Sequence, residues 1–144
     1  MIEIYTDGAC NQKTNVGGWA YCIHRDGELF YEDSGRVENT TNNKMEMTAA
    51  ICALRYMRGC PARSDIISTN TDSSYMVNGI NEGWVYKWRE NGWISSKKSP
   101  VLNQNFWNEL QDLVVELNVE MKRILRSHPG IKYADKKAKV HTKC

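Results

Sequence analysis

The sequence of 144 residues lacks the features that mark secreted and membrane proteins. Its five cysteines are odd in number and show neither a CxxC pair nor His/Cys ligand spacing, which favours reduced thiols in the cytoplasm over a disulfide framework. No apolar run approaches the roughly 20 residues of a membrane span. Acidic residues and a glycine interrupt the N-terminal stretch MIEIYTDGAC too early for a signal peptide.

Internal repeats, low-complexity tracts and linkers are also missing, so we expect a single domain over residues 1–144. The length and the hydrophobic content of 41% suit a protein with a core of its own. The net charge of +2 decides nothing, but its distribution is uneven. Residues 119–144 hold eight Lys or Arg and two acidic residues, and a second basic group lies among tryptophans in 84–98. This asymmetry predicts an anionic partner.

Hydrophobic periodicity and turn residues predict an α/β fold. Strands are expected over residues 1–9, 17–25, 28–37, 65–71 and 119–125, and helices over 43–58, 73–80, 101–118 and 133–140. Asp26 and Gly27 predict a hairpin turn between the second and third strands. Asn43 is expected to cap the first helix, and residues 84–100 are expected to form a connection in which the element order allows one short helix. A hairpin meander followed by alternating strands and helices implies one mixed sheet with helices on both faces.

Four carboxylates occupy positions that suit a metal site. Asp7 lies on the first predicted strand just before Gly8, and Asp72 directly follows the fourth, so the two lie together if these strands are neighbours. The alanine-rich face of the first helix would bring Glu46 toward them, and Asp135 begins the last helix. Clustered carboxylates repel one another unless a cation lies between them, and oxygen ligands without Cys or His suit Mg²⁺ or Mn²⁺. Such acids beside a basic, aromatic segment indicate phosphodiester chemistry on nucleic acid.

Each carboxylate also has a purely structural interpretation. Asn43 and Glu46 fit a capping box, in which the glutamate bonds back to the helix start. Asp72 could cap the next helix, Asp7 could begin a turn, and Asp135 could complement a helix dipole. The joint placement of all four favours the metal site over these separate explanations.

The motifs of the chain resemble those of a known family. They are YTDGAC, GGWA, TTNNKMEMTAAICAL, TDSSYMVNGI, a GWxxxWxxxGW pattern and NQNFWNEL. In this order and spacing they resemble type 1 ribonuclease H of the bacterial kind, from Met1 to about Lys139. The resemblance implies a five-stranded sheet of order 3-2-1-4-5. It also implies a monomer without a protein or membrane partner, which cuts the RNA strand of RNA–DNA hybrids to leave 5′-phosphate and 3′-hydroxyl ends.

The same resemblance implies the catalytic residues. Asp7, Glu46, Asp72 and Asp135 match the family's acidic quartet, which holds two Mg²⁺ ions with substrate, with Mn²⁺ as a substitute. LRSHPG resembles the family's VKGHAG, so His128 matches the histidine of a mobile loop that assists attack or product release. The chain departs from the pattern here, because the gap from His128 to Asp135 is shorter than usual and an asparagine before that aspartate is missing.

Substrate contacts follow from the resemblance as well. The 2′-hydroxyl distinguishes RNA from DNA. The matching positions are Cys10, Asn42, Asn43 and Ser74 for the RNA strand, and Thr41 and Asn103 for a phosphate of the DNA strand. Lys13 lies in the first loop, where NQKTNVGG replaces a Gly- and Pro-rich run and changes how the loop follows the RNA strand. Local capping and turn formation are the structural alternative for these positions.

A basic protrusion of bacterial members, which contacts the DNA strand, matches the Trp- and Lys-rich segment. Its residues here are Trp84, Lys87, Trp88, Arg89, Trp93, Lys97 and Lys98. Cationic side chains would neutralise phosphates and aromatic faces would rest on sugars or bases. The alternative is that the tryptophans form a core between short helices, as expected for Trp88 and Trp107.

Other functions remain as alternatives. A DNA nuclease or junction resolvase of the same superfamily disagrees with the asparagine pair and the tryptophan segment. A hybrid-binding module without catalysis disagrees with the intact acidic quartet, although the short gap after His128 leaves room for it. A domain cut from a reverse transcriptase is less favoured than a free-standing protein, because Met1 directly precedes the first strand.

Overall fold

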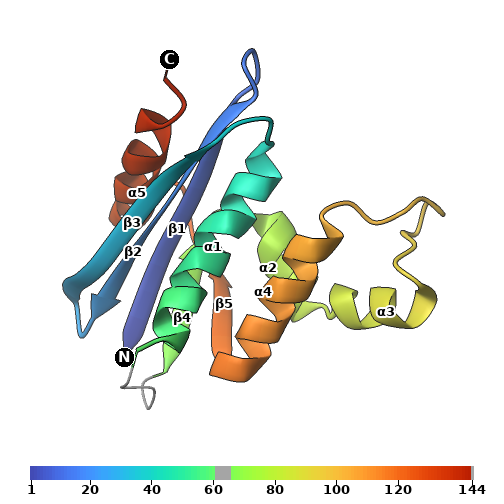
Figure 1. The fold of residues 1–144 in the computed structure, drawn as a ribbon. Coiled ribbons are helices and arrows are strands. Elements are labelled where there is room, and N and C mark those ends of the chain that lie inside the picture. Colours follow the sequence, from blue (N-terminus) through green and yellow to red (C-terminus); the bar gives the residue numbers. More distant parts are fainter. Residues whose placement is uncertain (61–65, 144) are drawn as a thin grey trace.

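The computed structural model describes residues 1–60 and 66–143. A five-stranded sheet lies between α1 with α4 on one side and α5 on the other (Figure 1). The elements are β1 Ile2–Asn11, β2 Val16–Arg25, β3 Glu28–Val37, α1 Asn42–Arg58, β4 Ile67–Thr71, α2 Ser74–Asn81, α3 Trp84–Asn91, α4 Gln104–Leu117, β5 Val119–Arg123 and α5 Pro129–Val140. Within the described residues, no helix is both long and apolar enough to span a bilayer.

The strand order is β3-β2-β1-β4-β5, which confirms the expected topology. Strands β1, β2 and β3 pair antiparallel, whereas β4 pairs parallel with both β1 and β5. In the β1–β4 pair Tyr5 lies opposite Asn70, so the same register carried two residues further sets Asp7 opposite Asp72. Asp7, within β1, therefore lies beside the carboxyl end of β4.

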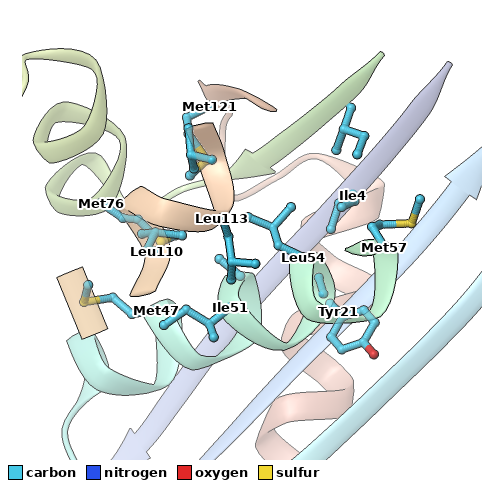
Figure 2. Close-up of a cluster of buried hydrophobic side chains, with 14 of the residues drawn as sticks. Ile4, Tyr21, Met47, Ile51, Leu54, Met57, Met76, Leu110, Leu113 and Met121 are labelled. Atoms are coloured by element: carbon cyan, nitrogen blue, oxygen red, sulfur yellow. The ribbon is translucent and has the colours of Figure 1, made fainter. Parts of the chain in front are cut away.

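The main core lies between the sheet and helices α1 and α4. Figure 2 shows Ile4 of the sheet, Leu54 of α1 and Leu113 of α4 meeting in this core, and all three are buried. Methionines 47, 57, 76 and 121 fill the remaining space in the same cluster, as their flexible side chains allow. The core anchors α1 against β1 and thereby fixes where Glu46 emerges.

Helix starts differ from the expectation by one or more residues. The cap of α1 is Thr41, whose hydroxyl accepts from the Lys44 N–H at 3.2 Å, and not Asn43. Helix α2 is capped by Ser73, whose hydroxyl accepts from the Met76 N–H, so Asp72 is free of that role. Polar residues stand next to one another at both helix starts, and the composition does not say which of them adopts the extended backbone of a cap.

The connection over residues 84–100 contains α3, the short helix that the expected element order allowed there. Two further boundaries were wrong. Helix α5 begins at Pro129 and not at Tyr133, because proline suits the first turn of a helix. Strand β5 ends at Arg123, two residues early. The expected first residue of the fourth strand, Asp65, lies outside the described residues, and β4 begins at Ile67.

Candidate active site

Three carboxylates gather where the carboxyl end of β4 adjoins β1. Asp7 comes from β1, Asp72 directly follows β4, and Glu46 comes from the first turns of α1. Each offers an oxygen that lies within 4.8 Å of the others. This confirms the expectation that Asp7 and Asp72 lie together and that α1 brings Glu46 to them.

Glu46 is held by the sheet and not by its own helix. Its Oε1 accepts from the Gly8 backbone N–H at 2.6 Å, and its Oε2 accepts from the Thr71 hydroxyl at 3.4 Å. Gly8 is needed for this approach, since a Cβ there would collide with the backbone of Met45 and Glu46. The capping-box interpretation of Glu46 is therefore wrong, because Thr41 caps the helix and Glu46 bonds to β1 and β4.

The electrostatics of the cluster favour a bound cation. Burial raises the pKa of Asp7 far above its ordinary value, and the neighbouring carboxylates of Glu46, Asp135 and Asp72 raise it further. Burial also raises the pKa of Glu46. A divalent ion among these oxygens would replace the lost solvation and reverse the repulsion. The donors are all carboxylate oxygens, a set that fits Mg²⁺ or Mn²⁺.

Asp135 approaches the cluster from the opposite face of the sheet. It lies on α5, which packs across β1 and β2, and it lines the same cavity of about 440 Å³ as the three carboxylates. The Lys139 ammonium lies 3.0 Å from Asp135 Oδ2, one helical turn further along α5. The four acidic residues predicted from the sequence thus surround one cavity.

His128 lies elsewhere. Its Nδ1 accepts from the Gly130 N–H at 3.0 Å, which makes it the cap of α5. Its ring stacks on Tyr5 with centroids 5.1 Å apart and an angle of 20° between the planes. The side chain is not among the described residues that line the cavity, so the structure does not bring His128 to the carboxylates. A catalytic role for His128 stays a prediction.

The residues expected to contact the RNA strand and those expected to contact the DNA strand line two separate hollows of the surface. The residues matched to the RNA strand, Cys10, Asn42, Asn43 and Ser74, line the carboxylate cavity. Thr41 and Asn103 line a neighbouring groove of about 570 Å³, as expected for a pair that shares one phosphate. Asn43 borders both hollows. Lys13 is exposed in the turn between β1 and β2, outside both linings.

The Trp-rich segment is partly core and partly surface. Trp107 is fully buried, and Trp84 and Trp88 pack against it with centroids 6.0 and 5.6 Å away, so the structural interpretation of Trp88 and Trp107 is confirmed. Trp93 extends this stack through Trp88. Helix α3 stands apart from the sheet (Figure 1), and Lys87, Lys97 and Lys98 are exposed there.

Arg89 is the exception among the cations of this segment. Its guanidinium donates to Asn108 Oδ1 and lies 3.0 Å from Asp112 Oδ1, both on α4. The side chain therefore ties α3 to α4.

Comparison with known proteins identifies the family. The family model described as RNase H matches residues 1–143. The chain belongs to the ribonuclease H family. It is 46% identical over 113 residues to the ribonuclease H of Caldanaerobacter subterraneus subsp. tengcongensis, covering 78% of this chain and 71% of that protein. It is 41% identical over 136 residues to the ribonuclease H of Wolbachia sp. subsp. Drosophila simulans, covering 92% and 86%.

Solved structures agree on the fold. LC9-RNase H1, described as a type 1 RNase H with the type 2 active-site motif, superposes with a TM-score of 0.80 at 27% identity, covering 98% of this chain and 71% of that chain. LC11-RNase H1 in complex with RNA/DNA hybrid superposes with a TM-score of 0.76 at 22% identity, covering 97% and 95%. The expected ribonuclease H-like fold is therefore confirmed.

Two cations at the cavity were missed in the sequence. Arg126 Nε lies 2.8 Å from Asp72 Oδ2, and Lys139 pairs with Asp135, so each binds a carboxylate of the cavity. The signal for Lys139 is its spacing of four residues from Asp135 on a helix. Arg126 follows β5 and gives no local signal beyond its place in a basic stretch, because its partner lies 54 residues away.

Proposed function

We propose that this ribonuclease H family member is an endoribonuclease that hydrolyses the RNA strand of RNA–DNA hybrids and leaves 5′-phosphate and 3′-hydroxyl ends. The observation that carries the proposal is the cluster of Asp7, Glu46 and Asp72 oxygens within 4.8 Å of one another at the end of the central strands. The ribonuclease H relatives and a neighbour bound to RNA/DNA hybrid support the substrate class.

Asp7, Glu46, Asp72 and Asp135 would hold two Mg²⁺ ions, with Mn²⁺ as a substitute. Once bound, the ions would supply an activated water and stabilise the charge on the leaving 3′-oxygen. Asp7 belongs to the cluster with Glu46 and Asp72, and it lines one cavity with Asp135. Asp7 would hold the ions together with Glu46 and Asp72, and Asp135 would add a carboxylate from α5.

The other residues of the site hold the Glu46 carboxylate and orient the substrate. The Gly8 N–H and the Thr71 hydroxyl donate to the two oxygens of the Glu46 carboxyl and hold it beside β1 and β4, which favours a ligand set formed before substrate arrives. Asn42 and Asn43 lie in the first turn of α1, where backbone N–H groups lack helical partners and can bind a phosphate or a 2′-hydroxyl. Ser74 and Cys10 border the same cavity.

The DNA strand would use the second hollow and the protrusion. The groove between Thr41 and Asn103 would take one phosphate, and exposed Lys87, Lys97 and Lys98 would neutralise others further along. The shared border at Asn43 joins the two hollows into one surface, which suits two strands of a duplex. Arg89 would contribute less, because it is already paired with α4.

The cellular compartment and the oligomeric state are also part of the proposal. Cys10, Cys22 and Cys52 form no disulfide in the structure, which supports a cytoplasmic, reducing compartment. A monomeric enzyme is the family expectation. Size-exclusion chromatography with light scattering measures the mass directly, and a dimer would contradict it.

The test is cleavage of a labelled RNA strand that is annealed to DNA, annealed to RNA, or left single, with Mg²⁺ and with chelator. We expect cuts in the hybrid alone, only with the ion, and none in Asp72→Asn. Arg123→Gln, an exposed change on neighbouring β5, is the control that should keep full activity. Tight hybrid binding without cuts in Mg²⁺ or Mn²⁺ would instead support the hybrid-binding module.

A further inference from the structure

The segment between β5 and α5 is fixed at both of its ends. The Ile124 N–H donates to the Thr71 carbonyl at 2.8 Å, which ties the segment's start to the end of β4. At its other end His128 caps α5 and stacks on Tyr5. Between these anchors, Arg126 is the residue that lines the carboxylate cavity.

Arg126 covers the solvent side of Asp72. Its side chain is 86% exposed, whereas that of Asp72 is 10% exposed, and the two are joined through Arg126 Nε and Asp72 Oδ2 at 2.8 Å. A pair with so exposed a partner contributes little to stability. The contact is therefore easily exchanged for another one.

A divalent ion and Arg126 compete for the same carboxylate. An ion bound by Asp7, Glu46 and Asp72 would use Asp72 oxygens and would repel a guanidinium beside it. Loading the site would thus leave Arg126 at the rim of the cavity without its acidic partner. Lys139 lies at the same rim and pairs with Asp135 one turn away on its own helix.

The chemistry of the freed guanidinium points to a phosphate. Arginine presents several N–H donors in a rigid plane that matches two phosphate oxygens, and it stays charged at any working pH. The cavity it borders also contains Asn42, Asn43 and Ser74, the residues matched to the RNA strand. A phosphate of that strand is the anion that reaches this rim.

We propose that Arg126 exchanges Asp72 for a phosphate of the RNA strand when divalent ions load the site, and so positions that strand beside the carboxylates. The proposal rests on the proposed function for its substrate. It gives the β5–α5 segment a residue that contacts substrate, Arg126, where the family resemblance implies only His128. It also predicts two effects of opposite sign, because Arg126 competes with metal but assists hybrid.

The test compares Arg126→Gln, Arg126→Lys and the matched control Arg123→Gln, which removes the same charge from exposed β5. Equilibrium binding of an RNA–DNA hybrid in Ca²⁺, without cleavage, is measured across salt concentrations. We expect Arg126→Gln to weaken binding about three- to tenfold and to lower the slope of log K against log salt by about one. Arg126→Lys should keep the slope, since it keeps the charge.

A second readout needs no substrate. Calorimetric titration of Mg²⁺ into the free protein should show that Arg126→Gln binds Mg²⁺ several-fold more tightly than wild type or Arg123→Gln does. In turnover, Arg126→Gln should raise KM more than it lowers kcat. These shifts would not follow from a structural role alone.

Unchanged hybrid affinity and salt slope in Arg126→Gln, or an equal loss in Arg123→Gln, would overturn the assignment of Arg126. A wild-type protein that binds the hybrid with the Arg126-dependent slope but never cuts it would overturn the proposed function and leave Arg126 as a phosphate-binding residue. The two failures are therefore distinguishable.

Discussion

The Gly8 backbone N–H donates to Glu46 Oε1 across 2.6 Å and so joins strand β1 directly to helix α1. The bond needs the two backbones to lie in contact, which glycine and the alanine-rich face of α1 permit. One residue without a side chain thereby sets the position of a carboxylate that has been proposed to bind metal.

Gly8→Ala tests this relationship. The added Cβ would collide with the backbone of Met45 and Glu46, so β1 and α1 must separate. We expect a loss of about 1–3 kcal/mol in the free energy of unfolding, as for other overpacked sites, and a larger proportional loss of hybrid cleavage. Urea unfolding and single-turnover cleavage measure the two effects.

Gly59→Ala is the matched control. Gly59 has an ordinary φ of −81° and ends α1, and its nearest neighbour to an added Cβ is the Tyr56 carbonyl oxygen at 3.5 Å. Stability and activity should stay close to wild type. Equal losses in both variants would contradict the special role of Gly8.

Asp7→Asn should stabilise the metal-free protein while abolishing cleavage. The folded pKa of Asp7 lies above its unfolded value because of burial and neighbouring carboxyl groups. A raised carboxyl pKa means that the folded state binds the proton more tightly, so this contribution to stability is full below the unfolded pKa and is lost as pH rises toward the folded one. Asparagine does not ionise, so Asp7→Asn does not lose this stability as pH rises.

Thermal unfolding in chelator from pH 4 to pH 8 measures this difference. We expect Asp7→Asn to exceed wild type by about 2 kcal/mol near neutral pH, on the scale of 1.36 kcal/mol per pKa unit, and the advantage to shrink toward pH 4. A variant that is less stable than wild type at every pH would refute the electrostatic explanation.

Divalent ions should make wild type more stable than Asp7→Asn. Mg²⁺ that binds only the folded state stabilises wild type by RT ln(1 + [L]/Kd), about 2.7 kcal/mol at a hundredfold excess over Kd. Asp7→Asn and Asp72→Asn should gain much less, because each removes a carboxylate from the cluster. Differential scanning calorimetry with Mg²⁺ against a chelator measures the gain, and an equal gain in all three proteins would place the ion elsewhere.

His128 offers a test between a structural and a catalytic residue. His128→Ala removes the Nδ1 cap of α5 and the stack on Tyr5, so we expect a loss of about 1 kcal/mol with kcat within a few-fold of wild type. His128→Asn should recover part of the stability, because asparagine is a good N-cap. A large fall in kcat that asparagine does not rescue would show that His128 leaves Tyr5 and acts on substrate.

Much of the site was predictable because it follows from strand order. Asp7 lies within β1 and Asp72 directly follows the neighbouring parallel strand β4, and a hydrophobic pattern is enough to predict both strands. The role of Glu46 was ambiguous in sequence, since Asn43 and Glu46 fit a capping box that the structure replaces with Thr41 and a bond to Gly8.

The β5–α5 segment was the least predictable part. Pro129 starts α5 four residues before the expected position, and this early start makes His128 a cap instead of a loop residue. Proline at a helix start is a signal that sequence alone contains. The Arg126–Asp72 pair has no such signal, because it depends on how β5 and β4 lie side by side.

Substitutions in the basic protrusion should show which of its cations contact substrate. Lys87 is exposed on α3, whereas Arg89 on the same helix is paired with Asp112 and Asn108 of α4. Lys87→Ala should therefore weaken hybrid binding uniformly across sequences and reduce its salt slope by about one, with kcat unchanged.

Arg89→Ala is the contrasting variant on that helix. It should leave the salt slope nearly intact and lower stability by up to about 1 kcal/mol, the range of exposed ion pairs. Filter binding over a salt series and urea unfolding separate the two effects. A slope change in Arg89→Ala that matches Lys87→Ala would mean that Arg89 leaves α4 when the duplex arrives, and that the link between α3 and α4 is itself part of hybrid recognition.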